Sequence, residues 1–343
     1  MQKIKTEAFL LKQKGSPALA FSLEEVSIDL AKSDEVLIEV DSFGLNYADV
    51  MARNGLYKEA PAMPCVIGYE VVGTVSQVGT EVSKELMGKR VVAFTRFGGY
   101  AKKVTTKASA IALIDDINTA TALSLCTQSV TAYYMADYIA PIQKNEVVLI
   151  HAAAGGVGTI LIQLAKKKGA VVIAKIGSES KRSLVESLGA DFVVNYKTTD
   201  YVTAVGEYLK GKKIDCSYNP VGGASFKQDL KMIAPGGKLF LFGGSALSSK
   251  WGIFSSLNFV RKMGLIIPIG FMMQSKSVLG VNMLKIADAK PEVIQHSLEA
   301  VIKLYKAGTI EPQIGGEFKS SQLAEAHTQL ENGSSVGKLV VHW

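Results

Sequence analysis

The stretch VVLIHAAAGGVGTILIQLAKKKGA, residues 147–170, limits the possible folds of this chain more than any other segment. It begins with Val147–His151, a short apolar and β-branched run that is typical of a buried parallel strand. A turn of small residues follows, and apolar residues then recur at helical spacing until Gly169, which suits a helix C-terminus. The order of strand, glycine-rich turn and helix predicts the first βα unit of a parallel α/β sheet.

The turn itself carries a dinucleotide-binding fingerprint, with Ala153, Gly155 and Gly158 at its first, third and sixth positions. Small residues let the backbone approach a pyrophosphate, whose charge is stabilised by the unpaired N–H groups at the helix N-terminus. A purely structural turn is the alternative, but the strand before it and the helix after it favour nucleotide binding. We expect Gly156 and Val157 to contact the cofactor together with these three residues.

The end of the second strand decides between NADH and NADPH, because a carboxylate there would bind the ribose 2′-hydroxyl of NADH. Here Val171–Ile176 is followed by Gly-Ser rather than by an acid, and Lys181 and Arg182 come soon after. A 2′-phosphate is bound by hydroxyls and cations, so Ser178 and Lys181 predict NADPH. Two alternatives stay open. Glu179 could face the ribose if the strand ends later, and the two cations could lie on the exposed face of the next helix.

The composition fits an enzyme of two domains. The chain has 343 residues, of which 48% are apolar, and this is too long for one ordinary core. Its formal charge of +7 is dispersed, and the densest run, Lys166–Lys168, closes a helix, so we expect no nucleic-acid surface.

Three distant cysteines imply no disulfide framework, and lysines interrupt the N-terminal residues, so we expect a cytoplasmic protein without a signal peptide. The longest uncharged apolar segment, Met263–Met273, has 11 residues and is too short to span a bilayer.

Strand-like runs broken by Gly-rich turns fill residues 1 to about 126 and predict an antiparallel, barrel-like domain. The clearest of these runs are Val36–Val40, Val71–Val75, Val91–Phe94 and Gly98–Val104. Residues 127 to about 280 alternate between strand and helix, which predicts a parallel sheet with crossover helices. The tail, with a helix expected over Pro291–Ala307 and a strand over Gly337–Val341, need not belong to the nucleotide fold and could return to the first domain.

Short motifs along nearly the whole chain carry a family resemblance. They are GLNYAD (44–49), GLY (55–57), GYE (68–70), GGYA (98–101), TAY (131–133), HAAAGGVG (151–158), NPVGG (219–223) and FGG (242–244). Through them the chain resembles the medium-chain dehydrogenases/reductases of the quinone oxidoreductase branch, related to zeta-crystallin. The resemblance implies a GroES-like catalytic domain, residues 1–126 completed by 281–343, and a doubly wound Rossmann domain over 127–280. Residues 200–202 and the region from Trp251 onward look most like the synaptic-vesicle membrane protein branch.

The chain departs from the zinc-dependent relatives of this family. They place a cysteine in the first of these motifs, where this chain has Asn46. They place Gly-His-Glu where this chain has Gly-Tyr-Glu, so that Tyr69 stands at the histidine position. Neither residue suits catalytic zinc, no closely spaced set of four cysteines suits a structural zinc, and His151 is better explained as the end of a strand. We therefore expect a zinc-free reductase in which NADPH passes hydride to a quinone or an enone. The acceptor oxygen then gains negative charge and needs hydrogen-bond donors.

By this resemblance, Asn46, Tyr47, Asp49 and Tyr57 are the candidate catalytic residues near the nicotinamide. Asn46 could orient the acceptor or the carboxamide, and Tyr57 could donate a hydrogen bond or a proton. Asp49 could instead cap a helix, and either tyrosine could be half-buried packing. The further cofactor contacts that we expect are Gln128, Thr131, Tyr196, Phe242, Gly243 and Asn282.

A second class of function stays open, an NADPH-binding sensor or a membrane-associated adaptor with little turnover. It is motivated by Trp251–Met273, whose aromatic residues and methionines are interleaved with Arg261 and Lys262, as on a surface that touches a membrane. We favour a wall of the substrate pocket or a dimer contact for this segment. The family pairs edge strands of its Rossmann sheets, so we expect a homodimer formed through Ser277–Val281.

Overall fold

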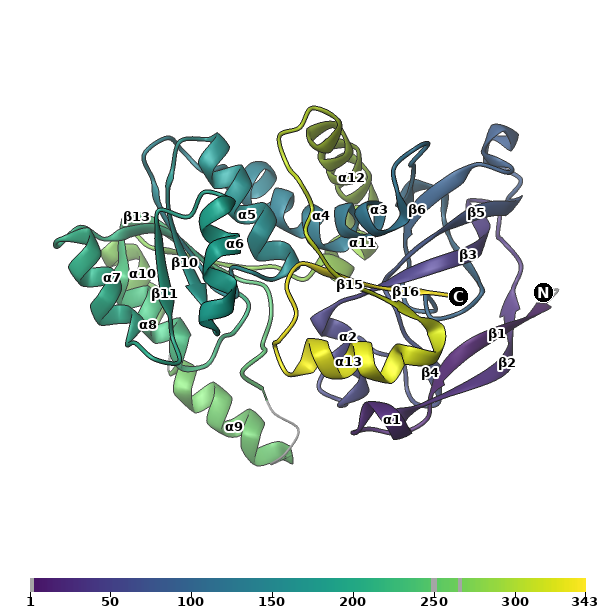
Figure 1. Cartoon of the computed structure of the whole chain (residues 1–343), viewed down its shortest axis with the longest axis horizontal. Coiled ribbons are helices and arrows are strands. Elements are labelled where there is room, and N and C mark those ends of the chain that lie inside the picture. Colours follow the sequence, from purple (N-terminus) through teal and green to yellow (C-terminus); the bar gives the residue numbers. More distant parts are fainter. Residues whose placement is uncertain (1–2, 248–251, 265–266) are drawn as a thin grey trace. The chain divides into compact units, whose positions relative to one another are not determined.

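The computed structural model describes residues 3–247, 252–264 and 267–343, and the chain divides into two compact units (Figure 1). The first unit comprises Met1–Val130, Leu284–Leu304 and Pro312–Trp343, and the second comprises Thr131–Met283 and Tyr305–Glu311. Functional domain boundaries near residues 126 and 280 stay a prediction. Trp251 and residues 265–266 of the apolar segment discussed above lie outside the described residues. None of the helices in the described ranges is long and apolar enough to cross a membrane.

Two mainly antiparallel sheets build the first unit. The smaller has the order β2-β1-β4, and the larger has the order β15-β16-β3-β5-β6-β8, with β7 also paired to β3. The strands are β1 (Lys3–Leu11), β2 (Phe21–Asp29), β3 (Glu35–Leu45), β4 (Cys65–Val66), β5 (Glu70–Val78), β6 (Arg90–Phe94), β7 (Lys103–Lys107), β8 (Ile111–Leu113), β15 (Ile314–Lys319) and β16 (Lys338–His342).

The core of this unit follows from the alternation of side chains along its strands. Val36, Ile38 and Val40 on β3 point to one face and are buried with Val71 and Val75 of β5. The last strand, β16, pairs antiparallel with β3. The tail of the chain therefore completes the sheet that begins near residue 35.

The strand expected over Gly98–Val104 is only partly correct, because β7 begins at Lys103. Phe97 and Gly98 both adopt positive φ, at 73° and 84°, which turns the chain out of an extended conformation. The N–H groups of Gly98 and Tyr100 donate instead to the carbonyl groups of Val66 and Ile67. These residues form a loop whose hydrogen bonds are satisfied by the end of β4 and the residue after it.

Short helices flank these sheets, and three helices cross a boundary between the units, namely α4, α11 and α12. The helices are α1 (Pro17–Ala20), α2 (Tyr47–Arg53), α3 (Thr119–Leu125), α4 (Thr127–Tyr133), α11 (Met283–Ala289), α12 (Pro291–Lys306) and α13 (Leu323–Glu331), with 3₁₀ turns η1 (Lys84–Leu86), η2 (Ala108–Ala110) and η6 (Ser320–Gln322) and the π-helical η3 (Tyr134–Ile139).

The second unit is the parallel α/β sheet expected from the sequence. Its six strands have the order β11-β10-β9-β12-β13-β14, and every neighbouring pair is parallel. They are β9 (Val147–Ile150), β10 (Val171–Ile176), β11 (Phe192–Asn195), β12 (Ile214–Asn219), β13 (Ile233–Leu241) and β14 (Ser277–Gly280). The four residues of β9 are all buried, as expected for a central strand covered on both faces.

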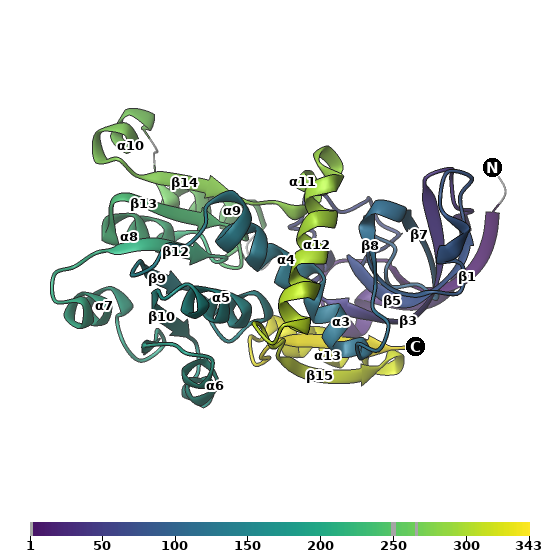
Figure 2. The ribbon, with the colours of Figure 1, turned by 90° about the horizontal axis from the view of Figure 1, so that it is seen from above.

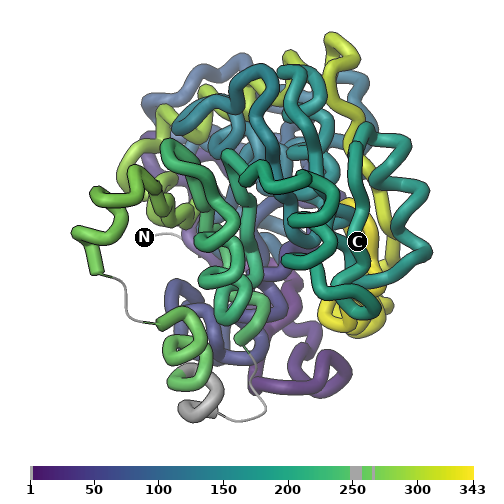
Figure 3. The backbone as a smooth tube through the Cα atoms, turned by 90° about the vertical axis from the view of Figure 1, so that its left-hand side faces the viewer, coloured from purple at the N-terminus to yellow at the C-terminus, as the bar shows by residue number. Residues whose placement is uncertain are grey.

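Helices connect the successive strands of this sheet. They are α5 (Gly156–Lys167), α6 (Arg182–Ser187), α7 (Tyr201–Leu209), α8 (Ala224–Met232), α9 (Gly252–Met263) and α10 (Pro268–Gln274), with the 3₁₀ turn η4 (Glu179–Lys181). The helices α5 and α6 lie on one face and α7 and α8 on the other (Figures 1 and 2). Figure 3 views the unit from the side of α7 and α8, where α9 and α10 are two separate light-green coils.

Candidate functional site

The strand order of the second unit reverses between β9 and β12, because β10 and β11 lie beyond β9 while β13 and β14 lie beyond β12. The two central strands pair in register, with Ile150 opposite Tyr218. Their carboxyl ends therefore lie side by side, and each leads into a turn. In open α/β sheets, ligands bind at such a switch point.

The glycine-rich turn after β9 requires small residues. A Cβ on Gly158 would lie 2.6 Å from the carbonyl oxygens of both Ala152 and Ala153, so only glycine lets α5 approach the turn this closely. Gly155 is the N-cap of α5, and its N–H donates to the Ala152 carbonyl at 2.8 Å. The residues expected to bind a pyrophosphate, namely Ala153, Gly155, Gly156, Val157 and Gly158, all lie in this turn or in the first turn of α5.

The ends of β10 and β11 bring together the residues expected to bind the adenosine end. Tyr196 follows β11 directly and is 50% exposed, and a Cβ on Gly177 would lie 3.0 Å from its hydroxyl oxygen. Ser178 precedes η4, where its hydroxyl lies 2.8 Å from that of Ser180. Lys181 closes η4, and burial, with a smaller effect of Lys197, lowers its pKa.

Glu179, which could have faced the ribose of NADH, is paired with another residue. Its carboxylate accepts a hydrogen bond from the Arg182 guanidinium, and this contact lowers the pKa of Glu179. Arg182 also donates to Glu186 at 3.4 Å. Of the two cations that follow β10, Arg182 is thus held by carboxylates.

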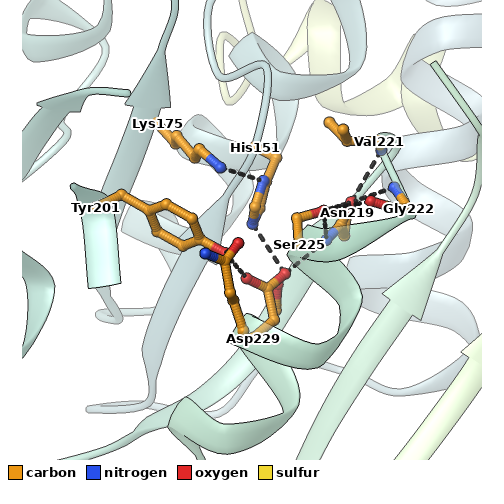
Figure 4. A network of polar contacts seen from close by, with 10 residues as sticks. His151, Lys175, Tyr201, Asn219, Val221, Gly222, Ser225 and Asp229 are labelled. Atoms are coloured by element: carbon orange, nitrogen blue, oxygen red, sulfur yellow. Dashed lines mark hydrogen bonds and ion pairs between the residues drawn. The ribbon is translucent and has the colours of Figure 1, made fainter. Parts of the chain in front are cut away.

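Beneath these turns lies a buried polar network centred on Asp229 of α8 (Figure 4). One carboxylate oxygen, Oδ1, accepts from the Tyr201 hydroxyl at 2.8 Å. The other, Oδ2, accepts from Ser217 at 2.8 Å and from Asn219 Nδ2 at 2.6 Å, and lies 2.9 Å from His151 Nε2. Burial alone would raise the pKa of Asp229, but His151 and these donors lower it below its ordinary value.

Lys175 adds a buried cation to this network, since its residue is only 7% exposed. Its Nζ lies 3.4 Å from His151 Nδ1 and 3.5 Å from the centre of the Tyr201 ring. Burial lowers the pKa of Lys175 to about 8, against the opposing effect of Asp229. Burial likewise lowers the pKa of His151. The imidazole is therefore neutral at pH 7, and it lies between a carboxylate and an ammonium group.

The remaining expected cofactor contacts lie at several places. Phe242 and Gly243 follow β13, and a Cβ on Gly243 would lie 2.7 Å from the carbonyl oxygen of Pro220, so the turns after β12 and β13 pack closely. Asn282 is exposed and lies two residues after β14. Gln128 and Thr131 are both buried on α4.

In the first unit, the amide of Asn46 takes part in a buried ionic cluster. Its Nδ2 donates to Glu70 Oε1 at 2.8 Å, and Lys338 Nζ donates to its Oδ1 at 3.2 Å. Lys338 also forms an ion pair with Glu70, whose other oxygen accepts from the Thr127 N–H at 2.7 Å. The side chains of Lys338 and Glu70 are fully buried. Both ends of the Asn46 amide are thus held by contacts that join β3, β5 and β16.

The other candidate catalytic residues differ in exposure. Asp49 is fully buried, accepts from the Asn46 N–H at 2.8 Å as a helix-capping residue would, and burial raises its pKa to about 8. Tyr47 and Tyr57 are half-buried, and the Tyr57 ring meets Tyr69 edge-on with centroids 6.0 Å apart. Burial raises the pKa of Tyr57 to about 12 and also raises that of Tyr47. All three groups are therefore largely protonated at neutral pH.

Asp229 and Lys175 were not identified from the sequence, although both are charged residues at positions where the sequence pattern predicts an apolar side chain. Asp229 lies on the same face of α8 as Phe226 and Leu230, at the spacing of a core position. Lys175 interrupts an otherwise apolar strand. In each case a charge occupies a place where the pattern predicts an apolar side chain.

Comparisons with known proteins agree with this fold. Residues 32–116 match the family model of the alcohol dehydrogenase GroES-like domain, and residues 156–299 match that of zinc-binding dehydrogenases. Together with the parallel sheet, these matches confirm a GroES-like domain and a Rossmann domain. Within the described ranges, no group of three or more His, Cys, Asp or Glu residues is placed to hold a metal ion.

Individual relatives cover most of the chain. A quinone oxidoreductase of Pseudomonas aeruginosa is 30% identical over 309 residues, 90% of either chain. A synaptic vesicle membrane protein VAT-1 homolog of Danio rerio is 29% identical over 96% of this chain, which spans 66% of the length of that protein. The crystal structure of Escherichia coli quinone oxidoreductase complexed with NADPH has a TM-score of 0.86 at 25% identity and covers 98% of this chain and 100% of its own.

Proposed function

Because the chain belongs to the quinone oxidoreductase family of medium-chain dehydrogenases/reductases, we propose that it uses NADPH to reduce quinones or other conjugated carbonyl compounds. The observation that carries the proposal is the turn at the switch point, where Gly158 leaves no room for a Cβ. The Escherichia coli relative forms a complex with NADPH, which supports the same cofactor here.

The residues of the second unit fit this cofactor. Gly155, Gly156 and Val157 open the N-terminus of α5, whose unpaired N–H groups would bind the pyrophosphate. Ser178 and Lys181 would bind the 2′-phosphate, and the half-exposed ring of Tyr196 would lie against the adenine or the phosphate. Arg182 is already held by Glu179 and Glu186, which argues against it as the phosphate ligand.

When bound, NADPH would supply a hydride to the acceptor. The chain would then need to donate to the acceptor oxygen, which becomes negative. We propose Tyr57 rather than Asp49 for this role, because the phenol is protonated at neutral pH and only half-buried, whereas the Asp49 carboxyl is fully buried. Asn46 would orient the acceptor or the carboxamide, with its amide already fixed by Glu70 and Lys338. Tyr47, beside Asn46, stays a candidate.

The choice of cofactor is tested with Lys181→Ala. A charge-assisted hydrogen bond contributes roughly 1.5–3 kcal/mol, so NADPH should bind about tenfold more weakly or worse, while NADH affinity stays unchanged. Dissociation constants from fluorescence titration give the comparison. The matched control is Arg182→Ala, which removes a neighbouring cation held by Glu179 and Glu186 and should leave NADPH affinity unchanged.

Two outcomes would contradict this assignment. Equal losses for both cofactors in Lys181→Ala would show that the lysine only supports the fold. A wild-type preference for NADH would point to Glu179 on the ribose. Raised salt should weaken NADPH more than NADH, because the contact to the phosphate is partly exposed.

A sensor or membrane-associated adaptor is the second candidate function, and the exposed apolar residues of α9 and α10 favour it. They are Leu257, Val260, Ile269, Met272 and Met273, with Arg261 and Lys262 beside them. Flotation with anionic liposomes, set against NADPH consumption over a panel of quinones, alkenals and enones, separates the two classes. Turnover without flotation supports the reductase, and flotation without turnover supports the adaptor.

A further inference from the structure

Asp229 connects the two turns that flank the switch point. Through Oδ2 it contacts His151, the first residue after β9, and Asn219, the last residue of β12. The first turn is the glycine-rich turn of the proposed pyrophosphate site, and the second leads into residues 220–223. A single buried carboxylate oxygen is thus shared by both sides of the site (Figure 4).

The protonation of His151 makes its contact directional. Lys175 Nζ lies 3.4 Å from Nδ1, and an ammonium group only donates, so Nδ1 is the acceptor. The neutral imidazole then carries its proton on Nε2, which lies 2.9 Å from Asp229 Oδ2. The Ala153 N–H donates to the Lys175 carbonyl at 3.1 Å, so β10 holds both the imidazole and the turn behind it.

The Asn219 side chain links Asp229 to the second turn, because its amide forms hydrogen bonds with both. Its Nδ2 donates to Asp229 at 2.6 Å, which leaves Oδ1 facing the backbone. The N–H groups of Val221 and Gly222 both donate to this Oδ1 at 2.9 Å. The acceptor character of Asp229 therefore fixes the orientation of the Asn219 amide, and that orientation holds the turn.

We propose that Asp229 is a positioning residue that aligns the glycine-rich turn with the turn at residues 220–223, so that one dinucleotide can engage both. The inference rests on the proposed NADPH binding. In a doubly wound sheet, a dinucleotide lies across the switch point, with one mononucleotide on each half. A fragment that occupies only the adenosine half does not depend on this alignment.

Asp229→Ala tests the proposal because it removes the acceptor that His151 and Asn219 share. Asn219 Nδ2 then keeps only the Ser225 hydroxyl as an acceptor, at 2.9 Å, so the amide that holds the Val221 and Gly222 N–H groups is fixed less firmly. We expect NADPH to bind about tenfold more weakly or worse, and adenosine 2′,5′-bisphosphate to bind within about twofold of wild type.

Two further variants separate positioning from mere stability. Tyr201→Phe removes the donor to Oδ1 and keeps the ring that meets His151 edge-on, so it should lower the melting temperature and leave the NADPH dissociation constant unchanged. Asp229→Asn is the conservative variant. Its amide oxygen can take the place of Oδ2, and its amide nitrogen can face the Tyr201 hydroxyl, which can donate to Gln228 instead. It should therefore retain much of the NADPH affinity that Asp229→Ala loses.

The outcomes distinguish this inference from the function on which it rests. Wild-type protein that binds neither NADPH nor the bisphosphate would overturn the proposed function. Wild-type binding with an unchanged NADPH affinity in Asp229→Ala would overturn the positioning role alone. Equal loss of NADPH and bisphosphate in Asp229→Ala, or a Tyr201→Phe loss as large, would also overturn it, because the effect would then be general destabilisation.

Discussion

At the scale of single residues, the first unit contains a buried histidine whose charge state is set by its surroundings. The Tyr100 hydroxyl lies 3.1 Å from His327 Nε2, and the Arg53 guanidinium lies 3.3 Å from Nδ1. Burial, with a smaller effect of Arg53, lowers the pKa of His327 to about 3. The imidazole is therefore neutral in the folded protein, whereas in the unfolded chain it takes up a proton near pH 6.5.

This difference predicts a loss of stability in acid. Below pH 6.5 the unfolded chain binds one more proton at this site than the folded protein does, so the free energy of unfolding falls as the pH falls towards 3. Between pH 8 and pH 5 the contribution is about 2 kcal/mol. His327→Gln should reduce the difference between the two pH values by about this amount, measured by urea denaturation.

The matched control is His296→Gln, because His296 is exposed on α12. That variant should retain the pH dependence of the wild type. An unchanged dependence in His327→Gln would mean that His327 is already protonated in the fold.

At the scale of elements, the contact between α5 and the turn before it sets the geometry of the proposed pyrophosphate site. Replacing a helical glycine by alanine gains roughly 1 kcal/mol from helix propensity, whereas overpacking costs roughly 1–3 kcal/mol. At Gly158 the added Cβ meets backbone atoms at 2.6 Å, which cannot rotate away, so the steric cost is larger. Gly158→Ala should therefore lower the free energy of unfolding and weaken NADPH binding.

Gly155→Ala is the comparison, because its Cβ would meet its nearest neighbour, the Ala152 carbonyl oxygen, at 3.1 Å. It should cost less stability than Gly158→Ala in the same urea denaturation experiment. Equal stability losses for the two variants would contradict the steric explanation.

At the scale of the whole molecule, β14 is the last strand of the parallel sheet and pairs with β13 on one side. The Val281 N–H donates to Leu241 of β13, so the N–H of Gly280, one residue earlier, points to the opposite side. We predict that this edge joins two copies of the chain, and that light scattering at micromolar concentration gives twice the 36.7 kDa chain mass.

Gly280→Pro tests this edge, because proline removes the outward N–H and a Cβ at this position meets nothing within 4 Å. The variant should shift the mass towards one chain, while Gly280→Ala, which retains the N–H, should remain dimeric. A monomeric wild type, or a dimer that Gly280→Pro leaves intact, would contradict pairing through β14.

The sequence by itself determined the elements whose information is local. Strand, glycine turn and α5 fall within residues 147–170, and apolar periodicity with small residues is enough to specify them. The positions of Ser178 and Tyr196 just after strand ends, and of Lys181 shortly after β10, follow from the same reasoning, although their contacts with NADPH stay a prediction. The loop at Gly98 was misjudged because its hydrogen bonds go to residues 66 and 67, which strand patterns do not reveal.

Only the tertiary structure decided which buried charges meet. Lys338 pairs with Glu70, which lies 268 residues earlier in the sequence, and Asp229 on α8 lies next to His151 at the end of β9. A charge at a core position signals that a partner is needed, because an isolated buried charge is costly. It does not say which partner, since that depends on strand order and on how each helix packs. For this reason the cofactor turn could be read from the sequence, whereas the network beneath it could not.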